Sequence, residues 1–205
     1  MRSYFGKLFL FFVALAMNCG GEDVPASDCF STVCVDVQAE RGIIEVDLID
    51  YALDNDVCTE TIPAAETQNL IIRSIEKLPK PPNVPGPYQV KVDSFQLSYV
   101  PVVGNLDDCF NRFIQPTGIY TVDPGQTLSI PIPVVSQEIK GCLLGKYSLG
   151  PDPACRTARI VFPDFSSFYK VYGVLTFRVT EYYSGDSKIY RINFGTYILG
   201  DYTRQ

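Results

Sequence analysis

The chain has 205 residues, 17 basic and 23 acidic side chains, no histidine and a formal net charge of −6. An acidic surface repels phosphate backbones, so we expect no nucleic-acid partner. The lack of histidine excludes the usual Ser-His-Asp and Cys-His nucleophilic groups, and no phosphate-binding or nucleophile-elbow motif occurs. We therefore expect a protein that is not an enzyme and has no cofactor.

The first residues have the pattern of an export signal. Arg2 and Lys7 precede an unbroken apolar run at residues 8–17. A membrane-spanning helix needs about twenty apolar residues, whereas a run of this length suits the hydrophobic region of a signal peptide. We expect residues 1–18 to be that signal peptide. The A-x-A pattern at residues 14–16 offers an alternative cleavage site, which would give a soluble secreted or periplasmic protein.

Residues 16–19 (AMNC), followed by GGED, resemble the lipobox of bacterial lipoproteins, although Asn18 replaces the usual Gly, Ala or Ser. In that family the cysteine is acylated, for example with palmitate, and becomes the mature N-terminus. The resemblance implies lipidation of Cys19, a membrane partner reached through the lipid anchor, and a place in the bacterial cell envelope, at the outer membrane or cell surface.

The cysteine count agrees with lipidation, because seven cysteines leave one without a disulfide partner. With lipid on Cys19, six candidates remain for three disulfides. They are Cys29, Cys34, Cys58, Cys109, Cys142 and Cys155. Their spacing lacks the paired C-x2-C knuckles of zinc sites, so we expect no metal. The connectivity stays open among fifteen arrangements.

The first half of the mature chain reads as a tether followed by strands. Residues 19–32 are small and acidic and predict a lipidated tether. Alternating apolar residues predict strands at 33–37 and 42–53, and a change of phase within the second predicts a bulge. Residues 70–78 fit either a helix face or a strand, and we favour the strand. Together these elements form an N-terminal β-rich segment at residues 33–78.

Residues 79–87 contain five prolines in nine positions, which predicts a stiff connector and a division of the chain. A proline-rich docking peptide is the alternative. Three of the six candidate disulfide cysteines precede this connector and three follow it. At least one bridge must therefore join the two parts if all six pair.

The region 88–205 reads as strands throughout. Val90 and Val92 alternate, and a shift of phase before Phe95 predicts a second bulge. Residues 128–134 predict an edge strand because Pro131 and Pro133 cannot donate to a ladder. Further strands are expected at 158–162, 169–179 and 190–198, the last two joined by a turn at 184–186. We expect no helix in this region and a loop at 141–150.

Three segments of this region carry a resemblance: 90–102, 124–132 and 172–194. They resemble the immunoglobulin-like domains of bacterial lipoproteins of uncharacterised function. The implied fold class is all-β, an immunoglobulin/fibronectin-like β-sandwich at 88–205 with an N-terminal β-rich extension joined by disulfide bonds. The chain has no tryptophan, so an antibody-type domain is not implied. Such families act in adhesion, assembly or envelope scaffolding.

Oxygen ligands are the remaining candidates for chemistry. Asp50, Asp54 and Asp56 are weak calcium candidates, and Asp107 with Asp108 could bind calcium or act as a glycosidase pair. Our first hypothesis is a non-enzymatic envelope lipoprotein that scaffolds or binds another envelope protein or a polysaccharide. The alternatives are a carbohydrate-binding module using exposed tyrosines of 169–202 and a paired-carboxylate hydrolase.

Overall fold

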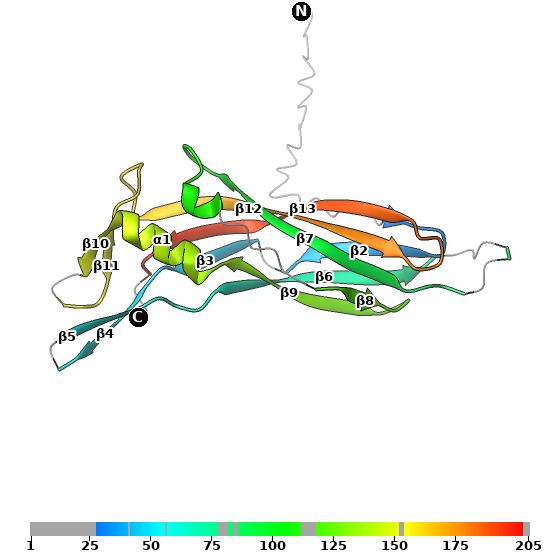
Figure 1. Cartoon of the computed structure of the whole chain (residues 1–205), viewed down its shortest axis with the longest axis horizontal. Coiled ribbons are helices and arrows are strands. Elements are labelled where there is room, and N and C mark those ends of the chain that lie inside the picture. The colour runs from blue at the N-terminus through cyan, green and yellow to red at the C-terminus, as the bar shows by residue number, and fades with distance from the viewer. Residues whose placement is uncertain are drawn as a thin grey trace, which may run out of the picture.

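The computed structural model describes residues 28–40, 42–55, 57–77, 82–83, 86–111, 118–151 and 154–202, so Cys19 and the expected signal peptide lie outside the described residues. The described chain is mostly β-strand, with one α-helix and one short 3-10 helix (Figure 1). None of its helices has the length and apolar character needed to cross a bilayer.

Two larger sheets hold most of the strands. One contains, in order, β1 (Asp28–Cys29), β2 (Val33–Ala39), β6 (Glu66–Glu76) and β9 (Thr127–Val135). The other contains β3 (Ile43–Asp47), β13 (Ser187–Gly200), β12 (Phe168–Glu181), β7 (Val90–Pro101) and β8 (Tyr120–Val122). Two hairpins complete the set: β4 (Asp50–Asp54) with β5 (Val57–Thr61), and β10 (Ser148–Pro151) with β11 (Ala158–Ile160).

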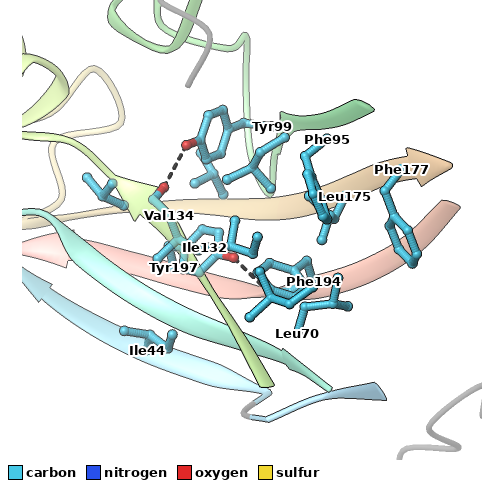
Figure 2. Packing of buried hydrophobic residues seen from close by; sticks show 14 of the residues in the cluster. Ile44, Leu70, Phe95, Tyr99, Ile132, Val134, Leu175, Phe177, Phe194 and Tyr197 are labelled. Atoms are coloured by element: carbon cyan, nitrogen blue, oxygen red, sulfur yellow. Dashed lines mark hydrogen bonds between the residues drawn. The ribbon is translucent and has the colours of Figure 1, made fainter. Parts of the chain in front are cut away.

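The two larger sheets face each other across one apolar core (Figure 2). Strands of both alternate between buried and solvent-facing side chains, the period-two pattern of a sheet with one buried face. Two tyrosines join the layers through their hydroxyl groups. Tyr99 of β7 donates to the Val134 carbonyl of β9 at 2.6 Å, and Tyr197 of β13 hydrogen-bonds to the Gln68 side chain of β6 at 3.1 Å.

Strands from both sides of the proline connector share these sheets, so the connector at 79–87 does not separate two sheets. β6 pairs with β9, and β3 pairs in parallel with the last residues of β13. The segment 33–78 therefore supplies strands to both layers and is not an appendage on a sheet built from residues 88–205. Of the connector itself, the structure describes residues 82–83 and 86–87.

Several strand predictions are confirmed. Residues 70–76 of the ambiguous segment lie in β6, with Leu70 and Ile72 fully buried. Among the described strands, β9 pairs with β6 alone, as its prolines predict for an edge strand. The phase shift in β7 is a bulge at Ser94, which has a φ of 59°, and the register with β12 shifts there.

Two other predictions, about where a strand changes phase, are wrong. The shift expected as a bulge in 42–53 is a break: β3 ends at Asp47, and β4 begins in a different sheet. In β13 the register shifts at Gly195, whose φ is 115°, so that Tyr197 and Leu199 are buried instead of Ile198. A bulge exchanges the two faces of a strand for all later residues.

The largest departure from expectation is helix α1 (Gln137–Tyr147), where no helix was predicted and a loop was expected from residue 141. The Ser136 side chain caps it by accepting from the Ile139 amide at 3.3 Å. Ile139 and Leu143 bury one face, and the buried Lys140 ammonium bonds to the Ala64 carbonyl at 2.8 Å and to Glu66 at 3.1 Å. Tertiary contacts therefore stabilise a helix whose own propensity is weak.

All six candidate cysteines are paired: Cys29 with Cys34, Cys58 with Cys155, and Cys109 with Cys142. The first bridge joins neighbouring strands β1 and β2, and the third ties α1 to the 3-10 helix η1 (Asp108–Asn111). The Cys58–Cys155 bridge connects residues on opposite sides of the connector, as parity predicted. Three disulfides indicate an oxidising compartment.

Candidate functional site

A cleft of about 310 Å³ lies where β7 ends and β12 begins. Its walls come from the loop after β7 and the loop before β12, which lie together at one end of the five-stranded sheet (Figure 1). The residues that line it are Val102, Val103, Gly104, Asn105, Pro163, Asp164, Ser166, Phe168, Tyr169 and Lys170. This volume is at the lower end of the range for small-molecule sites.

The two walls separate because the strand pairing stops there. The Val102 amide donates to the Lys170 carbonyl at 3.0 Å, one step beyond the last β7–β12 pair, Pro101 opposite Val171. The chain then turns at Gly104, whose φ of 73° falls in the left-handed region that favours glycine. The sheet thus supplies the base of the cleft, and the loops supply its walls.

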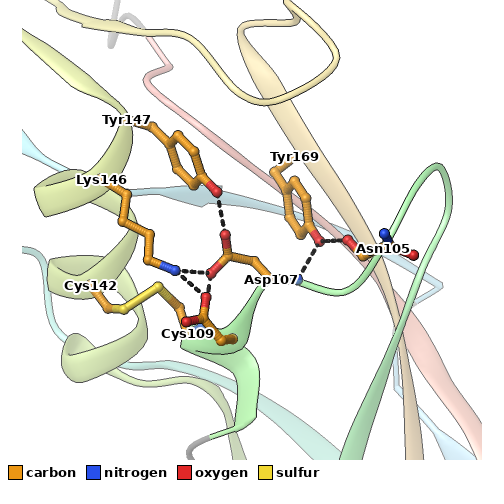
Figure 3. A network of polar contacts seen from close by, with 8 residues as sticks. Asn105, Asp107, Cys109, Cys142, Lys146, Tyr147 and Tyr169 are labelled. Carbon is orange, nitrogen blue, oxygen red and sulfur yellow. Dashed lines mark hydrogen bonds and ion pairs between the residues drawn. A yellow bond between two sulfur atoms is a disulfide. The ribbon is translucent and has the colours of Figure 1, made fainter.

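The first wall is fixed from behind by a polar network (Figure 3). The Tyr169 hydroxyl at the base of the cleft accepts from the Asp107 amide at 2.9 Å and donates to the Asn105 carbonyl at 3.0 Å. The Asp107 carboxylate accepts from the Cys109 amide at 2.8 Å, pairs with Lys146 at 3.0 Å and accepts from the Tyr147 hydroxyl. These contacts hold the loop against α1.

The charges of this network do not suit acid catalysis by Asp107. Burial would raise the pKa of its carboxyl group, but hydrogen bonds from Tyr147, the Cys109 amide and Lys146 outweigh burial and lower it. The same hydrogen bond, followed by burial, raises the pKa of Tyr147 to about 12. At neutral pH, Asp107 is therefore a carboxylate and Tyr147 a neutral donor, which is a structural arrangement.

Asp107, Asp108 and Cys109 bring three potential ligand atoms within 4.8 Å of one another. The group does not fit a metal ion, because the Cys109 sulfur is bonded to Cys142 and the Lys146 ammonium contacts both carboxylates. A cation bound by these carboxylates, or a water that they activate, would have to lie beside this ammonium. The expected carboxylate pair at 107 and 108 thus serves to hold α1 and η1 together.

The second wall contains an unusual aromatic residue. The Phe165 amide donates to the Phe162 carbonyl at 2.8 Å, and the Phe162 amide donates to the Ser166 carbonyl at 3.0 Å, which closes a tight turn. Phe165 has a φ of 58° and is 92% exposed. A bulky side chain is disfavoured in the left-handed region, by about 1–2 kcal/mol, and its ring is left in water.

The cleft combines an apolar surface with polar groups of both hydrogen-bonding types. Val102, Val103 and Phe168 are all partly or largely exposed. Among the residues that line the cleft, Asn105 contributes an amide and Lys170 an ammonium. This combination of apolar, charged and amide side chains gives the cleft groups that can contact a ligand.

Two of the three calcium candidates lie apart in the described chain. Asp50 and Asp54 stand at the two ends of β4. With a rise of about 3.3 Å per residue their α-carbons are about 13 Å apart, too far to share an ion directly. Asp56 lies outside the described residues, as does Cys19.

The tyrosines of 169–202 do not all face solvent. Tyr169, Tyr190 and Tyr197 belong to the core, while Tyr172 is partly exposed on β12. Tyr182 and Tyr183 are exposed beyond the other end of β12. The exposed tyrosines are thus divided between the two ends of one strand, and none of them lines the cleft.

Sequence reasoning did not identify Phe165, Val102 or Val103. The one available signal was composition: VPVVG and FPDFSS place apolar residues among turn formers. Solvent-facing apolar residues in a turn mark a candidate contact surface, but the two segments meet only in the folded chain.

Comparisons with known proteins add little here. No family model matches the sequence, and no curated protein matches it. Among solved structures, the chain is similar to Spo0M, a sporulation control protein from Bacillus subtilis, with 12% sequence identity and a TM-score of 0.30. The match covers 84% of this chain and 51% of that one, so this chain spans about half the length of Spo0M.

Proposed function

We propose that the chain is a non-enzymatic lipoprotein of the bacterial cell envelope whose cleft binds another envelope component. The observation that carries the proposal is the cleft itself, with its exposed apolar wall at Val102 and Val103 and the solvent-exposed ring of Phe165 beside it. Apolar residues gathered at one exposed site are typical of a recognition surface. The fixed polar network behind the wall keeps this surface ordered.

The envelope location is supported by the cysteines. The six cysteines after residue 28 pair with one another, so Cys19 has no cysteine of this chain left to pair with. The lipobox-like residues 16–19 offer that thiol a different use, as the site of acylation. We further propose that the two facing sheets are an immunoglobulin-like sandwich, as the strand pattern of 88–205 suggests.

A non-enzymatic role is supported by the absence of histidine from the sequence and by the partners of the acidic pair. Lys146 pairs with both Asp107 and Asp108, and neither aspartate lines the cleft. A paired-carboxylate hydrolase would need two acids facing its substrate.

Intact mass spectrometry of protein purified from its native membrane tests the anchor. We expect a mature chain that begins at an acylated Cys19 and in which alkylation labels six thiols only after reduction. The variant Cys19→Ser should lack the acyl mass and leave the membrane fraction. A retained leader, or six alkylated thiols without reduction, would contradict the proposal.

Binding to isolated envelopes tests the cleft. Val103 is 67% exposed, and Val57 in the β4–β5 hairpin is 63% exposed and does not line the cleft, so the two form a matched pair. In a sedimentation assay, Val103→Asp should weaken binding about tenfold or more, the effect of losing about 1.4 kcal/mol. Val57→Asp should bind as the wild type does. Equal binding by both variants would remove the cleft from the proposed function.

A further inference from the structure

We propose that the ligand of the cleft is a neutral polysaccharide segment, and that the Phe165 ring is the platform on which a sugar ring stacks. This inference rests on the proposed function and names its ligand class. The sequence suggested exposed tyrosines as the sugar-binding surface. Here the stacking residue is instead Phe165, which lies beside polar groups of the cleft.

First, folding does not explain the choice of phenylalanine at position 165. Its φ of 58° favours glycine or asparagine, and its ring is 92% exposed. Both effects disfavour the side chain in the free protein. Positions where a residue is held against its local preferences cluster at functional sites. Its neighbours Asp164 and Ser166 line the cleft and Phe165 itself does not, so the turn that carries Phe165 forms the edge of the cleft.

Second, the polar lining suits hydroxyl groups. Within the described part of the chain, the Asn105 side-chain amide and the Lys170 ammonium make no hydrogen bond or ion pair. One oxygen of the Asp164 carboxylate accepts from the Ser166 amide at 3.0 Å. A sugar hydroxyl both donates and accepts, so it can use this mixture of donors and acceptors.

The charges of the lining also favour a ligand without net charge. Lys170 and Asp164 carry opposite charges and both line the cleft. A strongly anionic ligand would meet the Asp164 carboxylate, and a cationic ligand would meet the Lys170 ammonium. A wholly apolar segment would bury these groups without partners, which is unfavourable. A neutral polyhydroxyl ligand avoids all three penalties.

Third, the apolar lining suits the C–H face of a sugar ring. Val102, Val103 and Phe168 provide this surface within the cleft. A cleft of about 310 Å³ holds a short part of a polymer, while Phe165 at the rim can contact the next part. The small volume and the open edge are both consistent with binding of one segment of a longer sugar chain.

The test is binding of the oxidised wild-type protein to five neutral trisaccharides, measured by saturation-transfer NMR and by titration. The five are cellotriose, laminaritriose, maltotriose, mannotriose and tri-N-acetylchitotriose. We expect at least one to bind. Phe165→Gly should weaken that binding tenfold or more while it raises the thermal unfolding midpoint by about 2–4 °C, because the turn loses its strain. Phe165→Tyr should restore binding, and Tyr182→Ala, an exposed aromatic outside the cleft, should change nothing.

Absence of binding by all five sugars, or unchanged binding by Phe165→Gly, would overturn the inference. Envelopes treated before the sedimentation assay separate this failure from failure of the proposed function. Loss of binding after periodate oxidation of vicinal diols supports the polysaccharide. Loss after protease treatment alone, with Val103→Asp still defective, would show a protein ligand: the cleft would then remain the binding site and the inference would fall.

Discussion

At the scale of single residues, Glu181 shows how a buried charge can stabilise this fold. The side chain is fully buried at the end of β12. Its carboxylate accepts from the Thr32 amide at 2.7 Å, from the Thr32 hydroxyl at 2.6 Å and from the Ser184 hydroxyl at 2.7 Å. Burial would raise the pKa of Glu181, but these hydrogen bonds outweigh it and lower the pKa.

The variant Glu181→Gln should therefore lose stability at neutral pH, by about 1.5–3 kcal/mol, the range for hydrogen bonds to charged groups. Because the folded pKa lies below the unfolded value of about 4.3, the stabilisation is present above that value and is lost as pH falls through the folded pKa. Urea unfolding at pH 7, 5 and 3 should show wild type and variant converging at low pH.

The control for this experiment is Glu138→Gln, an exposed glutamate in the first turn of α1. Its unfolding free energy should change little, because exposed charges near a helix end contribute only about 0.3–1 kcal/mol. If Glu181→Gln and the wild type keep a constant difference from pH 7 to pH 3, the buried carboxylate does not account for the acid sensitivity of the fold.

The roles of these residues could not be read from the sequence. Glu181 is a glutamate at the end of an alternating strand, and its partner Thr32 is 149 positions away in the chain. Phe165 lies among turn formers, but the sign of its φ is set by how the loop closes onto Phe162. The site residues are thus fixed by contacts between distant segments, which periodicity does not report.

At the scale of elements, the sequence predicted strands well where a single buried face imposes a period of two. The bulge at Ser94 was readable because apolar residues change phase there. The register shift at Gly195 was not predicted, because Ile198 continues the period-two alternation of the apolar residues before it. Helix α1 was missed because Gly141 and Gly145 weaken its pattern, and its stability comes from its cap, its disulfide and Lys140.

The β4–β5 hairpin is the element most dependent on a disulfide. Every residue of β5 except Cys58 is exposed, and an isolated two-stranded hairpin is marginal in water. Cys58 and Cys155 are 97 positions apart, whereas Cys29 and Cys34 are 5 apart. In the chain-entropy description a disulfide that closes a longer loop stabilises more.

Replacing Cys58 and Cys155 together by alanine should therefore lower the unfolding free energy by about 4–5 kcal/mol, against about 2 kcal/mol for the pair Cys29 and Cys34. Hydrogen exchange should also quicken across residues 50–61 in the first variant alone. Denaturant unfolding of both double variants provides the comparison. A larger loss from the Cys29–Cys34 pair, or unchanged exchange in the hairpin, would show that other contacts hold this element.

At the scale of the whole molecule, strands from before and after the proline connector complete one another. Strand periodicity predicted a fold built mostly from β-strands, and cysteine parity predicted a bridge across the connector; both are confirmed. The pairing of β6 with β9 and of β3 with β13 could not be predicted from the sequence. Strand patterning shows which face is buried but does not name the neighbouring strand.

This shared architecture predicts that residues 88–205 cannot fold alone, although their pattern resembles an independent domain. Without β2 and β6, β9 has no partner strand, and the core loses Val35, Leu70 and Ile72. A fragment of 88–205 carrying Cys155→Ser should lack near-ultraviolet circular dichroism and dispersed amide NMR signals. The chain from residue 20 carrying Cys58→Ser and Cys155→Ser is the control, and it should unfold in one transition, with calorimetric and van't Hoff enthalpies equal. A fragment with dispersed signals and cooperative unfolding would instead make the connector a true domain boundary.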